Sequence, residues 1–326
     1  MGMNVKHPLI SVVVACKDAD RYARECVQRT LDLDYPSFEL ILLPDSVPSD
    51  LDLRSPKLRV RVTGPVLPSV KRNIGVEMAR GEIIAFEDSD AFPRWDWLKN
   101  AVKYFNDPEV AAVGGPGVTP DGDGLMQRAG GAVLSSFMGG GGFSFRYTSR
   151  GIRECDDLPT VNLLVRRSVF EEVGGFDESY WPGEDTEFCL RVVHGLGKKI
   201  LYAPDVVVFH HRRPLFVPHL RQISGYGLHR GFFAKKLPET SRRLIYFLPS
   251  ILVASFGAGS VLSLSIPFLR APFLSTLSLY FLACFVSGLK TKSPKMAVLF
   301  FFGTVLTHLC YGVSFLRGVF SRRLRR

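Results

Sequence analysis

The pattern of apolar and polar residues divides the chain into two regions. Up to about Arg243, short apolar runs alternate with stretches in which apolar and charged residues are mixed. From Leu244 onward the chain is overwhelmingly apolar and nearly free of acidic residues. Short apolar runs are typical of buried strands in a parallel sheet, whereas long uncharged runs are typical of membrane helices. The pattern therefore predicts an α/β domain followed by a membrane region.

Predicted strands and helices alternate within the first region. The strands are expected at 9–16, 38–43, 58–62, 83–87, 110–115, 161–165 and 206–209. The helices are expected at 21–33, 68–79, 95–105 and 186–194. Strand, helix, strand, helix, strand is the doubly wound pattern, in which ligands bind at the carboxyl ends of the strands.

Acidic residues follow three of these strands. Asp18 follows the first strand, Asp45 the second, and Asp88 and Asp90 the fourth. Because side chains alternate between faces along an extended chain, Asp88 and Asp90 can point the same way and share a divalent cation. Oxygen ligands of this kind suit Mg²⁺ or Mn²⁺. The alternative is a solvated acidic loop without a metal, and the triplet alone leaves both interpretations open.

Basic residues give the 326-residue chain a formal net charge of +10, and they cluster beside the apolar segments. One cluster lies between Arg212 and Arg243, a second between Lys290 and Lys295, and a third begins at Arg322. Clusters of this kind attract anionic lipid head groups. The sequence contains no nucleic-acid-binding module, so we expect membrane lipids and no nucleic acid as the partner of these charges.

The cysteines and the amino terminus bear on the cellular compartment. The six cysteines show no Cys-x-x-Cys spacing, which favours a reducing compartment and argues against zinc. The chain does not start with a long apolar stretch followed by a cleavage site, so no signal peptide is expected. We therefore expect an integral membrane protein whose first region faces the cytoplasm.

Three segments of the second region, 245–269, 273–289 and 296–316, are near spanning length and essentially uncharged. Glycine, serine and alanine within them suit close helix packing, and an oligomer formed through these segments is one expectation. Three full spans would place the basic tail outside, although both the tail and residues 290–295 have a cytoplasmic composition. The number of spans is therefore open, with one segment re-entrant or in-plane as the alternative.

Other polar residues of the first region are candidates for binding or catalysis. His210 can complete a metal shell, and the guanidinium of Arg212 can bind a diphosphate through two hydrogen bonds. Glu184 and Asp185 open a predicted helix, whose dipole stabilises carboxylates; they are either helix caps or acid–base groups. Asn162 stands in an apolar strand and is either a structural residue or a substrate contact.

Several motifs occur in an order that resembles the family-2 glycosyltransferases with the GT-A fold. They are Ser11–Val14, Asp34–Leu40, Arg72–Gly75, Gly81–Asp90, Val173–Glu178 and Gly183–Phe188. The resemblance extends from about residue 8 to about residue 215. It implies a Rossmann-like catalytic domain with a doubly wound mixed sheet. It also implies transfer of a sugar from a nucleotide-diphosphate donor, usually with inversion.

The resemblance also implies roles for particular residues. The family's metal site, for Mg²⁺ or Mn²⁺, falls on Asp88 and Asp90, and the carboxylate that contacts the nucleotide base falls on Asp45. The general base falls on Asp185, with Glu184 as the alternative. The donor pocket is expected to include Ala15, Asp18, Asp45, Arg72, Asp88 and Arg212, with His210 as a third metal ligand.

Two stretches depart from the family pattern, and both belong to the expected nucleotide pocket. Pro44-Asp45 replaces the usual pair of acids, and Ala15-Cys16-Lys17-Asp18 replaces the usual Pro-Thr-Tyr-Asn. The resemblance therefore does not identify the donor.

The acceptor side is expected to include Asn162 and Glu184. The segment from Leu215 to Lys236 mixes apolar and basic residues and predicts an amphipathic helix at the membrane surface. Its Gln222 and Arg230 are expected to help close the pocket. The domain plan is a GT-A domain at 1–211, an interfacial segment at 212–243 and a membrane region at 244–326.

The sequence thus predicts an inverting glycosyltransferase that acts on a lipid-linked or polyprenyl-phosphate acceptor at the cytoplasmic membrane face. A processive polysaccharide synthase is one alternative, but the chain lacks a Gln-x-x-Arg-Trp motif. A non-catalytic membrane scaffold with a degenerate transferase domain is the other. The intact Asp88, Asp90 and Asp185 argue against the scaffold.

Overall fold

The computed structural model describes residues 7–47, 54–291 and 293–324. The chain forms two compact units, one of residues 1–118 and 148–211 and the other of residues 119–147 and 212–326. The break between residues 211 and 212 lies where the sequence placed the end of the catalytic domain. Residues 119–147, which that plan assigned to the catalytic domain, belong to the second unit.

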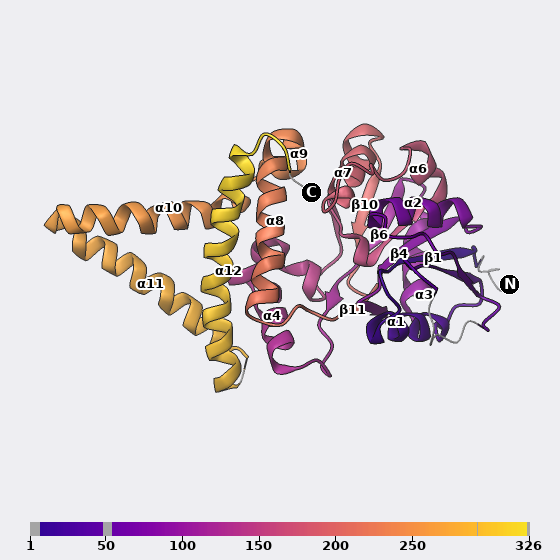
Figure 1. Cartoon of the computed structure of the whole chain (residues 1–326), viewed down its shortest axis with the longest axis horizontal. Coiled ribbons are helices and arrows are strands. Elements are labelled where there is room, and N and C mark those ends of the chain that lie inside the picture. The colour runs from indigo at the N-terminus through magenta and orange to yellow at the C-terminus, as the bar shows by residue number, and fades with distance from the viewer. Residues whose placement is uncertain (1–6, 48–53, 292, 325–326) are drawn as a thin grey trace. The chain divides into compact units, whose positions relative to one another are not determined.

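The first unit is built on a mixed eight-stranded sheet in the order β3-β2-β1-β4-β9-β6-β10-β8 (Figure 1). Its strands are β1 Ile10–Ala15, β2 Phe38–Leu43, β3 Leu58–Val60, β4 Ile83–Asp88, β6 Val110–Gly114, β8 Arg153–Cys155, β9 Leu163–Arg166 and β10 Lys199–Tyr202. Strands β3, β2, β1 and β4 are parallel, and β9 runs antiparallel between β4 and β6. The predicted doubly wound mixed sheet is therefore confirmed.

Helices cover both faces of this sheet, which explains why its central strands are continuously apolar. Helices α1 Arg21–Leu31 and α3 Trp97–Val102 lie on one face, and α2 Pro68–Met78 and α6 Arg167–Glu172 on the other (Figure 1). Val12 and Val14 pack in the core that includes α1 and α3. Val13 points to the other face, where α2 approaches so closely that a Cβ added to Gly75 would clash with it.

A second, three-stranded sheet lies beside the end of β4. It consists of β5 Ala91–Pro93, β11 Val208–His210 and β7 Gly117–Val118, in the order β5-β11-β7. Strand β11 pairs antiparallel with β5, so His210 lies opposite Ala91. The sequence predicted β11 but not β5, because three residues that include a proline give no periodicity to detect.

The second unit is helical. It contains α4 Leu125–Ser135, α5 Phe137–Gly140, α8 Val217–Lys236, α9 Pro238–Ser241, α10 Leu244–Ser265, α11 Arg270–Leu289 and α12 Pro294–Phe320. Three stretches within the described residues are long and apolar enough to cross a membrane, namely Leu244–Ser265, Pro267–Leu289 and Pro294–Phe320. These correspond to the three apolar segments that the sequence predicted.

Helix α8 is packed along one side of α12 rather than lying apart from the membrane helices (Figure 1). Glycines permit the close approach: a Cβ added to Gly227 would meet the backbone oxygen of Tyr311, and one added to Gly231 would meet that of Phe315. One face of α8 is therefore buried against α12. The apolar side of this helix packs on protein, in addition to any contact that it makes with lipid.

Candidate active site

The carboxyl ends of β1, β2 and β4 meet at one edge of the large sheet. Parallel pairing places Ala15, the last residue of β1, beside Asp88, the last residue of β4. Asp45 follows the adjacent strand β2 and forms an ion pair with Lys71 of α2. The Lys71 ammonium also donates hydrogen bonds to the backbone oxygens of Cys16, at 2.6 Å, and Leu43, at 3.2 Å. Lys71 thus holds together the ends of two strands and the carboxylate between them.

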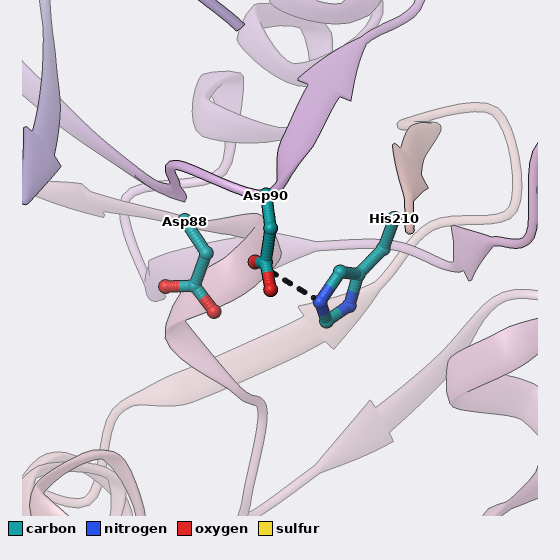
Figure 2. Close-up of side chains that lie close together, drawn as sticks. All are labelled: Asp88, Asp90 and His210. Carbon is teal, nitrogen blue, oxygen red and sulfur yellow. Dashed lines mark ion pairs between the residues drawn. The ribbon is translucent and has the colours of Figure 1, made fainter. Parts of the chain in front are cut away.

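Asp88, Asp90 and His210 converge at this edge (Figure 2). Each offers one ligand atom, and these atoms all lie within 4.8 Å of one another. The imidazole Nε2 of His210 lies 3.3 Å from Oδ1 of Asp90. The β5–β11 ladder produces this arrangement, because it aligns His210 with Ala91 and lets the His211 N–H bond the Asp90 carbonyl at 3.0 Å. Two carboxylates and an imidazole form a donor set that can bind a divalent transition-metal ion.

Arg72 connects this cluster to helix α7, which spans Glu184–Leu190. Its guanidinium donates a 2.7 Å hydrogen bond to Oδ1 of Asp88 and a 2.5 Å hydrogen bond to Oε1 of Glu184. Arg72 is 2% exposed and Glu184 is 2% exposed, so water screens this contact little. A buried arginine that binds two carboxylates fixes the position of α7 relative to Asp88 and the candidate metal site.

The two acids that open α7 lie in different environments. Burial raises the pKa of Glu184 to about 7, although the Arg72 guanidinium lowers it and the Asp185 carboxylate raises it further. Asp185 is only half-buried, and its Oδ1 accepts a 2.8 Å hydrogen bond from the Thr186 N–H. Its charge also helps to raise the pKa of Arg72. Glu184 is therefore a buried ion-pair partner, whereas Asp185 is accessible and close enough to act on the same network.

Glu87, the third acid of the β4 end, does not join the metal cluster. Its side chain is fully buried on the opposite side of the strand and accepts a 3.3 Å hydrogen bond from the Thr30 hydroxyl. The Cys26 thiol donates to the same oxygen at 3.7 Å. Burial raises the pKa of Glu87 well above its usual value. Burial therefore disfavours a negative charge on Glu87 beside Asp88 and Asp90.

The sequence left Asn162 open between a structural residue and an acceptor contact, and its contacts favour the structural role. Its side chain is 1% exposed and lies inside the first unit. The amide oxygen accepts a 2.9 Å hydrogen bond from the Trp97 indole, and the amide nitrogen donates to the Val206 carbonyl at 2.7 Å. These bonds identify Asn162 as a structural residue that ties α3 and the approach to β11 to the central sheet.

The remaining predicted residues fall in different places. Asp18 lies on the exposed turn after β1, close to the expected nucleotide pocket. Arg212, Gln222 and Arg230 belong to the second unit. There Arg212 donates to the Thr119 hydroxyl at 3.4 Å, and its guanidinium lies 4.8 Å from the centre of the Tyr147 ring.

Arg230 is likewise held within the second unit. It donates a 3.1 Å hydrogen bond to the Ser241 hydroxyl, and its guanidinium lies 4.7 Å from the Tyr246 ring centre. Gln222 is half-buried on α8. These contacts give Arg230 a structural role, and the pocket-closing role of both residues stays a prediction.

Two residues of the site, Lys71 and Trp181, are not evident from the sequence pattern. Lys71 precedes the recognised Arg72 motif, and only the fold shows that its ammonium reaches the ends of β1 and β2. Trp181 lies just before α7 with its ring centre 5.7 Å from the Arg72 guanidinium, and it is 43% exposed. An exposed aromatic ring beside a buried arginine is a candidate for contact with a sugar or a base.

A doubly wound mixed sheet with two aspartates and a histidine at its carboxyl edge defines the class of GT-A glycosyltransferases. Within that class, the sequence profile described as "Glycosyltransferase like family 2" matches residues 7–222, and the chain belongs to this family.

Curated relatives match over part of their length. The pre-mycofactocin glycosyltransferase of Mycobacterium tuberculosis is 29% identical over 203 residues, which are 59% of this chain and 41% of that protein. The glucosyl-dolichyl phosphate glucuronosyltransferase of Haloferax volcanii is 27% identical over 224 residues, covering 62% of this chain and 68% of that protein. The chain thus spans about two fifths of the mycobacterial relative.

Among solved structures, the mannosyltransferase PcManGT from Pyrobaculum calidifontis, in complex with GDP-Man and Mn²⁺, resembles the whole chain. The TM-score is 0.66, with coverage of 98% of this chain and 89% of that one. The sequence identity is 17%, so this likeness concerns the fold.

Proposed function

We propose that the protein is an inverting, metal-dependent glycosyltransferase that moves a sugar from a nucleotide-diphosphate donor to a lipid-linked acceptor at the cytoplasmic face of a membrane. The observation that carries the proposal is the convergence of Asp88, Asp90 and His210 at the same carboxyl edge of the sheet where Asp45 follows β2. Asp185, half-buried at the start of α7, supplies the accessible carboxylate that the reaction requires.

The donor set fits a divalent cation. An imidazole nitrogen suits Mn²⁺ better than Mg²⁺, because Mg²⁺ prefers oxygen ligands in a strict octahedron. We therefore favour Mn²⁺, with Mg²⁺ as the alternative, and the Mn²⁺ and GDP-Man named for the Pyrobaculum structure support this choice. When bound, the cation would neutralise charge on the departing nucleotide diphosphate. Arg72 holds Asp88 in place through Oδ1, which leaves the other carboxylate oxygen for the metal.

Asp185 is the proposed general base. Inversion by a single displacement requires one base on the acceptor hydroxyl and no covalent nucleophile. Glu184 is less suited to this task, because its carboxylate is buried and bound to Arg72 at 2.5 Å. Glu184 instead acts as a positioning residue that holds α7, and with it Asp185, beside the metal-binding carboxylates.

The acceptor is proposed to be lipid-linked, such as a polyprenyl phosphate. Three apolar helices tether the catalytic unit to a bilayer, so a lipid substrate lies within reach of the site through the same membrane. The name of the Haloferax relative, a dolichyl-phosphate glycosyltransferase, supports this substrate class. The basic clusters that flank the apolar helices support a cytoplasmic position of the catalytic unit.

The test uses the full-length protein in detergent with a panel of nucleotide sugars. Release of nucleoside diphosphate is measured with Mn²⁺, with Mg²⁺ and with EDTA, each with and without added polyprenyl phosphate. The proposal expects metal-dependent release from one donor that rises when polyprenyl phosphate is present. Nucleotide binding without release under any of these conditions would favour the non-catalytic scaffold.

A further inference from the structure

The three apolar helices of the second unit do not form a bundle of parallel rods. Helices α10 and α11 meet near their shared turn, where Gly259 is so close to Phe273 that an added Cβ would clash. Their other ends separate and contact α12 at different heights (Figure 1). The three helices therefore form the sides of a triangle.

Contacts fix which ends meet. The end of α11 packs on the start of α12, since a Cβ added to Gly288 would lie 3.0 Å from the Ala297 carbonyl oxygen. The start of α10 packs near the end of α12: the Ser250 hydroxyl donates to the Gly312 carbonyl at 2.9 Å, and the rings of Phe247 and Phe315 lie 4.7 Å apart. Both ends of α12 thus lie at the open base of the α10–α11 hairpin.

This arrangement is incompatible with three successive spans. In such a bundle, the carboxyl end of α12 would lie beside the α10–α11 turn, on the opposite side of the bilayer from the start of α10. Here it lies beside the start of α10 instead. We propose that α10 and α11 cross the bilayer as a two-span hairpin and that α12 lies, with α8, along the bilayer surface at the base of the hairpin.

Exposure and charge select α12 as the helix that does not cross. In the apolar 18-residue stretch of α10 and of α11, 11% is buried within protein, whereas 39% of the corresponding stretch of α12 is buried. Helix α8 covers α12 over much of its length. The hydroxyls of Ser224 and Ser314 are hydrogen-bonded at 2.8 Å, and the Lys235 ammonium donates to the Ser321 carbonyl at 2.6 Å. A spanning α12 would carry the exposed charges of α8 into the hydrocarbon, where charged side chains are costly.

The distribution of basic residues agrees with this topology. Basic residues lie at the base of the triangle, next to helix ends that the hairpin brings to one side; they are Arg242, Arg243, Lys290, Lys295 and Arg323. A two-span hairpin puts all of them on the same face of the membrane, as the positive-inside rule requires, against anionic head groups. With two spans, the basic tail no longer lies on the outer side of the membrane, as it would with three spans.

The hairpin has the dimensions of a complete crossing. The 22 residues of α10 rise about 33 Å, which matches the hydrocarbon thickness of a bilayer. The turn carries one cation, Arg270, whose guanidinium donates to the carbonyl oxygens of Ser263, at 2.9 Å, and Leu264, at 3.3 Å. At the far end of a full crossing, Arg270 reaches the opposite head groups while it caps the end of α10.

The first test uses the full-length chain with different epitope tags at its two ends, reconstituted into vesicles of phosphatidylcholine and phosphatidylglycerol. Added protease removes exposed tags. Both ends of a two-span chain lie on the same side of the membrane. Molecules with both ends outside the vesicle lose both tags, and molecules with both ends inside keep both, in any mixture of the two orientations. Molecules that lose one tag and keep the other would overturn the proposal, because three spans separate the ends.

The second test locates the turn with a membrane-impermeant maleimide. Ser265→Cys places a thiol at the exposed end of α10, and Arg323→Cys places a matched control thiol after α12. The wild-type chain, with its six cysteines, gives the background. Labelling of Ser265→Cys is expected in molecules whose amino-terminal tag is protected, and labelling of Arg323→Cys in molecules whose tag is cleaved. Two results would overturn a full crossing. One is labelling of Ser265→Cys in molecules whose amino-terminal tag is cleaved, and the other is labelling of Ser265→Cys only after detergent is added.

Discussion

Arg72 donates a 2.5 Å hydrogen bond to Glu184, and both residues are almost completely buried. The same guanidinium binds Asp88, so one side chain links the proposed metal site to the helix that carries the proposed base. Neither Arg72 nor Glu184 has to touch a substrate for this link to matter. Its loss would change both the stability of the fold and the placement of Asp185.

The first prediction concerns the stability of this ion pair. Glu184→Ala leaves the Arg72 charge buried with one partner, and loss of one member of a buried pair costs about 3–5 kcal/mol. Glu184→Gln keeps a hydrogen-bond acceptor and is expected to cost less. Glu171→Ala is the matched control, because its pair with Arg167 is exposed and such pairs contribute at most about 1 kcal/mol. Denaturant unfolding of the three variants measures the differences; equal losses for Glu184→Ala and Glu171→Ala would contradict the buried link.

The second prediction separates chemistry from donor binding. Asp185→Asn preserves shape but removes basicity, so the single-turnover rate should fall by about 10²–10⁴-fold while donor Kd stays unchanged. Asp45→Asn should instead weaken donor binding with a smaller effect on turnover at saturation. Donor Kd and single-turnover rate are measured for both variants. If Asp185→Asn weakens donor binding as strongly as it slows transfer, Asp185 has a structural or metal-related role and Glu184 becomes the candidate base.

The third prediction concerns the pH dependence of stability through His219 on α8. Burial, with a smaller contribution from the Arg212 charge, lowers the pKa of His219 to about 4. Its Nε2 lies 2.9 Å from the Thr307 hydroxyl of α12. Because the folded pKa lies below the unfolded value of 6.5, the folded state binds fewer protons below pH 6.5. The stabilisation is therefore complete above pH 6.5 and is lost as the pH falls toward 4.

The expected loss at pH 5 is about 2 kcal/mol relative to pH 7. His219→Gln removes the titrating group, so its unfolding temperature in detergent should depend less on pH between 7 and 5 than that of the wild type. Parallel curves for the two proteins would show that His219 is not protonated on unfolding in this range.

The strands and the acidic edge could be predicted from sequence because they depend on local patterns. Buried parallel strands are continuously apolar, and their carboxyl ends meet at one edge, so Asp45, Asp88 and Asp90 could be placed together before the fold was known. His210 could be named only as a candidate. Its position depends on β5, a strand too short for its pairing to be read from the sequence.

Other features depend on contacts between distant segments. The Arg72–Glu184 pair joins residues 112 positions apart, and nothing local to either residue indicates it. For Asn162 the sequence left a structural role and an acceptor contact both open, because a polar residue in an apolar strand fits either role. Trp97 and Val206, which satisfy its amide, come from other parts of the chain. The position of α12 across the base of the hairpin likewise depends on contacts with α10 and α11, which a hydropathy pattern does not reveal.

We propose that Asp88, Asp90 and His210 bind the divalent cation on which sugar transfer depends. The most direct measurement is Mn²⁺ binding, by electron paramagnetic resonance, alongside nucleoside diphosphate release from the preferred donor. Wild type, Asp90→Asn and His210→Ala are compared with Asp32→Asn, an exposed control at the end of α1. Asp90→Asn should lose both Mn²⁺ binding and release, His210→Ala should bind Mn²⁺ more weakly, and Asp32→Asn should match the wild type. Full release by Asp90→Asn in EDTA would contradict the account.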